Sequence, residues 1–104
     1  MIARFWLINL PSTDAAFDQL HHAAEINPDE FADLARGHRM AVLEAAFGRS
    51  LVRLEVKARA LHKAAERVGK RAAQLEAMGY ALGVTAVRVA IRERHEAAEL
   101  GVAS

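Results

Sequence analysis

The chain of 104 residues has no cysteine, only two prolines and six glycines, and only 6% aromatic residues. The lack of cysteine excludes disulfides, cysteine-ligated metal sites and a thiol nucleophile, and it favours a reducing compartment such as the cytoplasm. The low proline and glycine content, beside 53% hydrophobic and 26% charged residues, excludes collagen-like and disordered chains. We expect one folded domain over residues 1–104, because a single domain typically has about 100–150 residues.

The sequence also lacks a long hydrophobic run and an excess of charge of one sign. Its most apolar stretch, residues 5–10, is far shorter than the ~20 residues of a membrane-spanning helix and shorter than the ~7–15 residues of a secretory signal core. The formal net charge of +1 excludes a strongly cationic nucleic-acid binder and a polyacidic protein. Only local charge can therefore support nucleic-acid binding.

Alanine, by contrast, makes up about a fifth of the chain. It is the strongest helix former but contributes little buried area, so it favours helices that pack closely around a thin core. We therefore predict a mainly α fold: a small antiparallel helical bundle or hairpin, preceded by a short extended or β segment.

Capping signals divide the chain into elements. Residues 1–11 alternate like a strand or extended arm until Pro11, and a helix is expected over 12–26. Asn27 followed by Pro28 is a strong helix start, which predicts a helix over 28–47 with Gly48 as its terminator.

The strongest periodic signal is a heptad pattern of small and large residues over 50–78, which predicts one long helix. Alanine at such a seam lets a neighbouring backbone approach closely, so we expect an antiparallel homodimer through this helix, or a seam filled by helix 28–47 of the same chain. The seam residues are Leu51, Leu54, Ala58, Leu61, Ala65, Val68, Ala72 and Leu75.

Gly79 and Gly83 are expected to break the chain after this helix. The following segment, residues 84–91, fits both a strand and a helix period. We favour a helix over 84–100, because strong helix formers follow and Gly101 provides a stop.

Charge is distributed unevenly along the sequence. Residues 1–48 carry seven acidic and three basic side chains, whereas residues 49–79 carry eight basic and three acidic ones. One interpretation is that the acidic and basic helices attract each other. The alternative is that the basic face of helix 50–78 binds phosphates of nucleic acid. The residues for that role are Arg53, Lys57, Lys63, Arg67, Lys70 and Arg71.

The apolar N-terminal arm is a second candidate binding element. Phe5, Trp6, Leu7 and Ile8 could anchor a protein partner, since tryptophan and large apolar residues are typical of interface hot spots. The alternative is that the arm packs on the bundle and adds to its core.

No catalytic, metal or cofactor motif is evident. His21, His22 and Glu25 form one local group and His95, Glu96 and Glu99 another, but neither has the Glu-x-x-His order of a di-iron bundle. His38 falls on the apolar side of its helix, where a histidine more often bonds to the backbone than binds a ligand. We expect no enzyme activity, no catalytic residues, no metal and no cofactor.

The sequence therefore predicts a non-catalytic helical protein–protein interaction or regulatory protein. An adaptor, an inhibitor or a small subunit of a larger complex would fit, and the alanine- and arginine-rich composition is typical of bacterial or phage proteins. The partner is expected to be another protein, with nucleic acid as the weaker alternative and no membrane.

Overall fold

The computed structural model describes Leu7 and residues 27–101, and these residues form a helical bundle. Its helices are α2 (Pro28–Ala46), α3 (Leu51–Val68) and α4 (Arg71–Glu99), and no strand occurs in the described part of the chain. The mainly α prediction is confirmed. The expected arm over 1–11, apart from Leu7, and the expected helix over 12–26 lie outside the described residues.

The first helix begins where the sequence predicts. The Asn27 side chain accepts a hydrogen bond from the Glu30 backbone N–H at 2.9 Å and donates one to the Glu30 carboxylate at 2.9 Å. This reciprocal pairing satisfies polar groups at the start of α2 and explains why the helix begins at Pro28. The helix ends one residue earlier than predicted, with Phe47 as its cap and Gly48 at a φ of 103°.

The predicted helix over 50–78 is wrong, because the chain turns within it. Ser50 caps the start of α3 by accepting a hydrogen bond from the Arg53 N–H at 3.3 Å. The helix ends at Gly69, which has a φ of 71° and donates its N–H to the carbonyl of Ala65. Glycine adopts this left-handed conformation at little cost, so Gly69 terminates α3 and the chain reverses into α4.

The predicted break at Gly79 and Gly83 is also wrong, since α4 is continuous from Arg71 to Glu99. These glycines lie where α2 crosses α4. A Cβ on Gly79 would lie 1.8 Å from the carbonyl oxygen of Leu34, and one on Gly37 would lie 1.9 Å from that of Glu76. The two helices pack backbone to backbone, and this packing offsets the poor helix propensity of glycine. The helix favoured for 84–100 is confirmed as the second half of α4.

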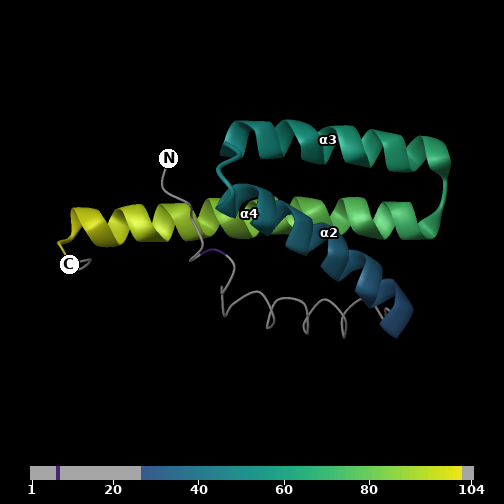
Figure 1. Ribbon diagram of the computed structural model, residues 1–104, viewed down its shortest axis with the longest axis horizontal. Helices are drawn as coiled ribbons and strands as arrows, with labels where there is room; N and C mark the ends of the chain where they lie inside the picture. Colours follow the sequence, from purple (N-terminus) through teal and green to yellow (C-terminus); the bar gives the residue numbers. More distant parts are fainter. Residues whose placement is uncertain (1–6, 8–26, 102–104) are drawn as a thin grey trace.

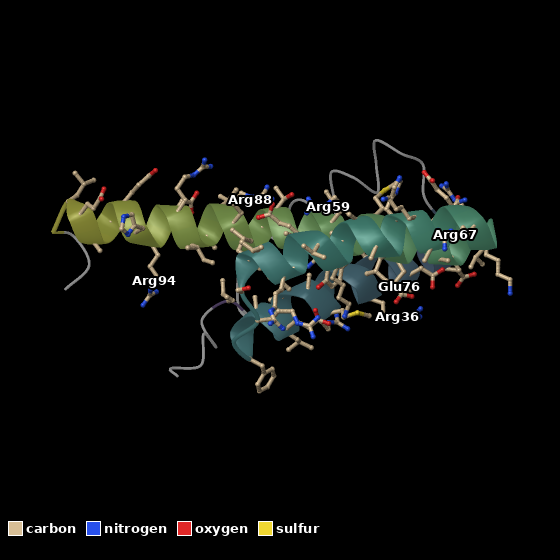
Figure 2. The ribbon with its side chains drawn as sticks, turned by 90° about the horizontal axis from the view of Figure 1, so that it is seen from above. Arg36, Arg59, Arg67, Glu76, Arg88 and Arg94 are labelled. Carbon is tan, nitrogen blue, oxygen red and sulfur yellow. The ribbon has the colours of Figure 1, made fainter. Side chains whose placement is uncertain are left out.

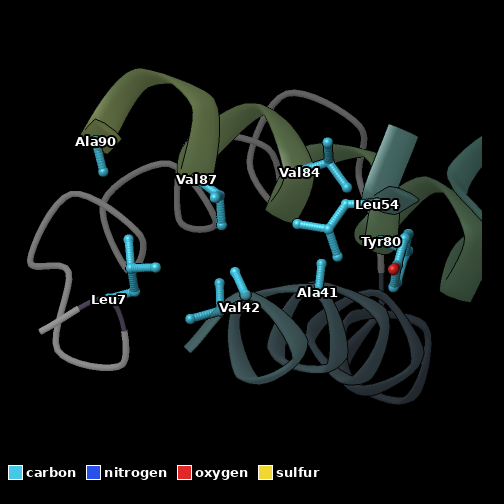
Figure 3. Packing of buried hydrophobic residues seen from close by; sticks show 9 residues of the cluster. Leu7, Ala41, Val42, Leu54, Tyr80, Val84, Val87 and Ala90 are labelled. Carbon is cyan, nitrogen blue, oxygen red and sulfur yellow. The ribbon is translucent and has the colours of Figure 1, made fainter. Parts of the chain in front are cut away.

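The long helix α4 is the element on which the other two pack. Figure 1 shows α2 crossing α4 obliquely and α3 lying antiparallel beside it. Contacts of α2 with α4 are the most extensive, those of α3 with α4 are fewer, and α2 and α3 barely touch. The core therefore lies along α4, as Figure 3 shows. Its buried members are Leu7, Ala41, Val42, Ala45, Leu54, Tyr80, Val84, Val87 and Ala90.

None of the described helices combines the length and the apolar character that crossing a bilayer would need. The longest helix, α4, carries six charged side chains between Arg88 and Glu99.

Candidate functional site

The hairpin of α3 and α4 forms an open groove of about 780 Å³. Its floor is made of small or apolar side chains, and its rim is made of charged and polar ones. The floor residues are Ala58, Ala65, Leu75, Ala77, Met78 and Ala81, and the rim residues are Arg59, His62, Lys63, Glu66, Arg71 and Gln74. We call this surface the α3–α4 groove.

The groove exists because small side chains occupy positions where α3 and α4 face each other. Ala65 and Ala77 are buried between the helices, while Ala81 is exposed and Met78 remains 46% exposed. Alanine reaches no further than its Cβ, so the two helices leave space between them above the floor. An exposed methionine is a flexible apolar contact for a ligand of varied shape.

The groove lies on the side of the hairpin away from α2. In Figure 2, Arg59 and Arg88 lie along one side of the α3–α4 pair, and Arg36 and Glu76 lie on the other. The ion pair between Arg36 and Glu76 joins α2 to α4 at 3.8 Å. The helix α2 therefore covers one side of α4 and leaves the α3–α4 groove open.

Charge around the rim is predominantly positive. The Arg71 Nε atom lies 2.8 Å from a carboxylate oxygen of Glu30. The Glu66 carboxylate lies 2.9 Å from Nε2 of His62, which is one turn earlier in α3. Arg59 and Lys63 are exposed and have no ion pair within the described part of the chain. The rim therefore presents two cations to whatever occupies the groove.

A second polar cluster, centred on Glu44, joins the three helices. The Tyr80 hydroxyl donates to the Glu44 carboxylate at 2.6 Å, Arg49 pairs with the same oxygen at 3.0 Å, and Lys57 contacts the other oxygen. The Lys57 ammonium also lies 5.3 Å from the centre of the Tyr80 ring, within cation–π range.

The environment of this cluster shifts two pKa values. Burial acts to raise the pKa of Glu44, but the hydrogen bonds from Lys57 and Tyr80 and the charges of Lys57 and Arg49 outweigh burial and hold that pKa below its ordinary value. Burial, and then the hydrogen bond to Glu44, raise the pKa of Tyr80. The tyrosine is thus kept protonated, as a structural donor requires.

The structure divides the predicted seam between α3 and α4 of the same chain. Leu54 and Ala65 are buried, while Leu51, Ala58 and Leu61 pack against the core in which α4 takes part. Ala72 and Leu75 belong to α4 itself, and Leu75 packs with Leu34 of α2. Val68, at the end of α3, is 56% exposed. The main neighbour of the α3 part of the seam is therefore α4, whereas helix 28–47 contacts the part of the seam that lies in α4.

The six basic residues considered for phosphate binding do not act as one free set. Lys57 is paired with Glu44 and Arg71 with Glu30, so two of the cations are neutralised by carboxylates of α2. Arg53 lines a separate depression with Glu44 and Arg49, whereas Lys63 lies on the groove rim. Arg67 and Lys70 are exposed. The attraction expected between the acidic and basic halves is thus present within the chain.

Four arm residues are candidates for partner binding. One of them, Leu7, is fully buried in the core. This position agrees with the alternative in which the arm packs on the bundle. Phe5, Trp6 and Ile8 lie outside the described residues.

The histidines show no metal-binding arrangement where the structure describes them. His95 pairs with Glu99 at 3.1 Å and both side chains are exposed, while His38 is buried, as predicted, on the apolar side of α2. Over Leu7 and residues 27–101, no three His, Cys, Asp or Glu residues are placed to hold a metal ion. His21, His22 and Glu25 lie outside these residues.

Comparisons with known proteins give no family for this chain: no family model, curated protein or solved structure matches it. The α3–α4 groove is therefore interpreted from its own chemistry. The sequence does not predict this groove, because the heptad pattern places Ala58, Ala65 and Leu75 on one long helix. A signal for the turn was present in Gly69, the single glycine within the heptad region before Gly79.

Proposed function

We propose that this protein is a non-catalytic helical interaction protein that binds another protein in the α3–α4 groove. An adaptor, an inhibitor or a small subunit acting in the cytoplasm would fit this role. The observation that carries the proposal is an open groove with an apolar floor, bounded by two helices and left uncovered by α2.

The lining of the groove favours binding over catalysis. Its residues include no serine, threonine, tyrosine or cysteine nucleophile, and its one histidine faces a carboxylate on the exposed surface of α3.

A different protein is the proposed partner, in preference to a second copy through the seam. Leu54, Ala65 and Leu75 are buried within the chain, so a dimer through the seam would require α3 to leave α4. A dimer contact of the same kind would bury no more apolar surface than the contact within the chain already does, so it would gain no hydrophobic free energy over the monomer.

Affinity capture from the native host, with three forms of the full chain as bait, tests the proposal. Ala81→Gln places a longer side chain in the groove, and Ala60→Gln makes the same change at an exposed position of α3 outside it. We expect one protein, identified by mass spectrometry, to be retained by the wild type and Ala60→Gln and lost with Ala81→Gln. The proposal would be contradicted if the baits retained nucleic acid in place of protein, or if Ala81→Gln retained the partner as well as the wild type does.

A further inference from the structure

We infer that the occupant of the α3–α4 groove is an amphipathic α-helix of another protein, with acidic residues flanking its apolar face. This inference rests on the proposed function and adds the chemistry of the partner. Three features of the groove support it: its shape, the small size of its floor residues and the charge of its rim.

The shape of the groove suits a helix better than an extended strand. Both walls are α-helices whose backbone groups already bond within their own helices, and the described residues offer no sheet edge to which a strand could add. A third helix laid between two antiparallel helices buries a stripe of its own side chains against both. The groove thus continues the packing that α2 makes on the other side of α4.

Because the floor residues are small, the large apolar side chains of the contact must come from the partner. Ala58, Ala77 and Ala81 offer little side-chain volume, so a docking backbone can approach closely and insert large apolar residues between them. Met78, and Leu82 one turn further along α4, are 46% and 38% exposed and extend the apolar contact beyond the alanines. The matching ligand therefore carries leucine- or phenylalanine-sized residues at helical spacing, every three to four residues.

The rim determines the charge of the partner. Arg59 and Lys63 have no ion pair among the described residues, and the carboxylate of Glu66 is already close to His62. A second copy of this chain docked by the same surface would bring the same excess of cations to the contact, and like charges facing each other are unfavourable. Acidic flanks are complementary to this rim, which favours a different, acidic helix over self-association.

Two synthetic peptides of about 18 residues, which is five helical turns, test the inference directly. They share one apolar face of leucines, and their flanks carry glutamate in one peptide and lysine in the other. Fluorescence anisotropy of the labelled peptides is measured against the full-length protein at low salt. We expect the glutamate peptide to bind about tenfold more tightly than the lysine peptide, since two exposed ion pairs each contribute modestly.

Charge reversal at the rim provides the decisive comparison. Arg59→Glu combined with Lys63→Glu should remove or invert the preference for the glutamate peptide. Arg67→Glu, at an exposed site of α3 outside the groove, should change it little. Ala81→Gln should weaken binding of both peptides, with Ala60→Gln as its matched control. Circular dichroism and urea unfolding of each variant establish that it is folded.

The outcomes separate this inference from the proposed function. Equal binding of the two peptides, or tighter binding of the lysine peptide, would overturn the acidic-partner inference. Failure of both peptides, while a host protein is still lost with Ala81→Gln, would overturn the helical partner but leave the proposed function standing. A dimer that Ala81→Gln dissociates, or an RNA hairpin that binds more tightly than either peptide, would assign the surface to those ligands instead.

Discussion

Gly37, Gly79 and Gly83 let the backbones of α2 and α4 approach more closely than any other residue type would allow. A Cβ on Gly83 would lie 2.7 Å from the carbonyl oxygen of His38, and the corresponding distances at Gly37 and Gly79 are shorter still. The obstacles at Gly37 and Gly79 are backbone atoms, which cannot move aside as a flexible side chain can. Glycine at these three positions is therefore required for the close packing of the two helices.

We predict that Gly79→Ala destabilises the protein, although alanine in a free helix would gain about 1 kcal/mol over glycine. The added Cβ would force α2 and α4 apart, and overpacking typically costs about 1–3 kcal/mol or more. Urea unfolding measures the change. Gly69→Ala is a comparison without a clash: its Cβ would have open space, so the ~1–2 kcal/mol expected there comes from the left-handed φ of +71° alone and leaves the α2–α4 contact intact. A Gly79→Ala variant as stable as the wild type would contradict the close crossing.

Glu44 makes a pH-dependent contribution to stability. Its pKa is lower in the folded protein than its ordinary value of 4.5, so its stabilising effect is fully present above that pH. The effect is lost as the pH falls through the folded-state pKa, because the neutral carboxyl no longer attracts Lys57 and Arg49.

We therefore predict that Glu44→Gln is less stable than the wild type near neutral pH, and that this difference shrinks as the pH falls below about 4.5. Urea unfolding at several pH values measures both proteins. Glu93→Gln, the same substitution at an exposed carboxylate in the C-terminal part of α4, should change the free energy of unfolding by no more than about 0.5 kcal/mol. If the difference in the free energy of unfolding between the wild type and Glu44→Gln stayed the same at every pH, the charge of Glu44 would not contribute to stability.

Among the elements, α3 is attached to the rest of the bundle by the fewest buried side chains. Only Leu54 and Ala65 are buried in α3, whereas α2 and α4 bury seven and eight residues. Hydrophobic burial and the Glu44 cluster therefore hold α3 in place, and both also maintain the α3–α4 groove.

We predict that Leu54→Ala costs about 2–5 kcal/mol, the usual range for truncating a buried leucine. Val56→Ala, on the same helix but 54% exposed, should stay within about 0.5 kcal/mol of the wild type. Urea unfolding compares the two, and hydrogen exchange should show faster exchange in α3 of Leu54→Ala than in the centre of α4. Equal effects of the two substitutions would contradict the packing of Leu54 in the core.

The element boundaries show which parts of this fold local sequence signals can specify. Asn27 with Pro28, and Ser50 before α3, specify helix starts because each cap acts within its own turn. The heptad pattern continued through Gly69, so the turn there was hidden by residues that fit the same period. Local sequence predicts Gly79 as a helix breaker, whereas its role in the fold depends on the backbone of Leu34, 45 positions away in the sequence. The groove exists because the chain turns at Gly69 and because α4 continues through Gly79. The local sequence pattern predicts neither feature, so it does not locate the groove.

For the whole molecule, the placement of histidines and carboxylates bears on metal content. Within Leu7 and residues 27–101, His62 and His95 each face a single glutamate on the surface, and no larger ligand group is present. A metal site in a helical bundle needs ligands that converge from facing helices. We predict that elemental analysis of the purified protein finds far less than one iron, manganese or zinc per chain. About one metal per chain would contradict this and reopen the question of an enzyme.

The distribution of charge over the whole molecule bears on nucleic-acid binding. The net charge is only +1, and Lys57 and Arg71 are neutralised by carboxylates of α2. The cations that remain exposed include Arg53, Arg59, Lys63, Arg67 and Lys70, and only Arg59, Lys63 and Arg67 follow one another at the i,i+4 spacing of one helix face. Few phosphates can then be contacted at once, and affinity for nucleic acid follows the number of phosphates neutralised.

We predict that an RNA hairpin or a DNA duplex binds this protein no more tightly than about 10⁻⁶ M at physiological salt, the non-specific range. For the duplex, the logarithm of the affinity should fall with the logarithm of the salt concentration with a slope of about −0.9 per phosphate contacted, which here means a shallow slope. Fluorescence polarisation at several salt concentrations gives both values. Lys63→Glu with Arg67→Glu should reduce this weak binding further, whereas Ala81→Gln should leave it unchanged. An affinity tighter than about 10⁻⁸ M, the range of specific complexes, would rank nucleic acid above a protein partner.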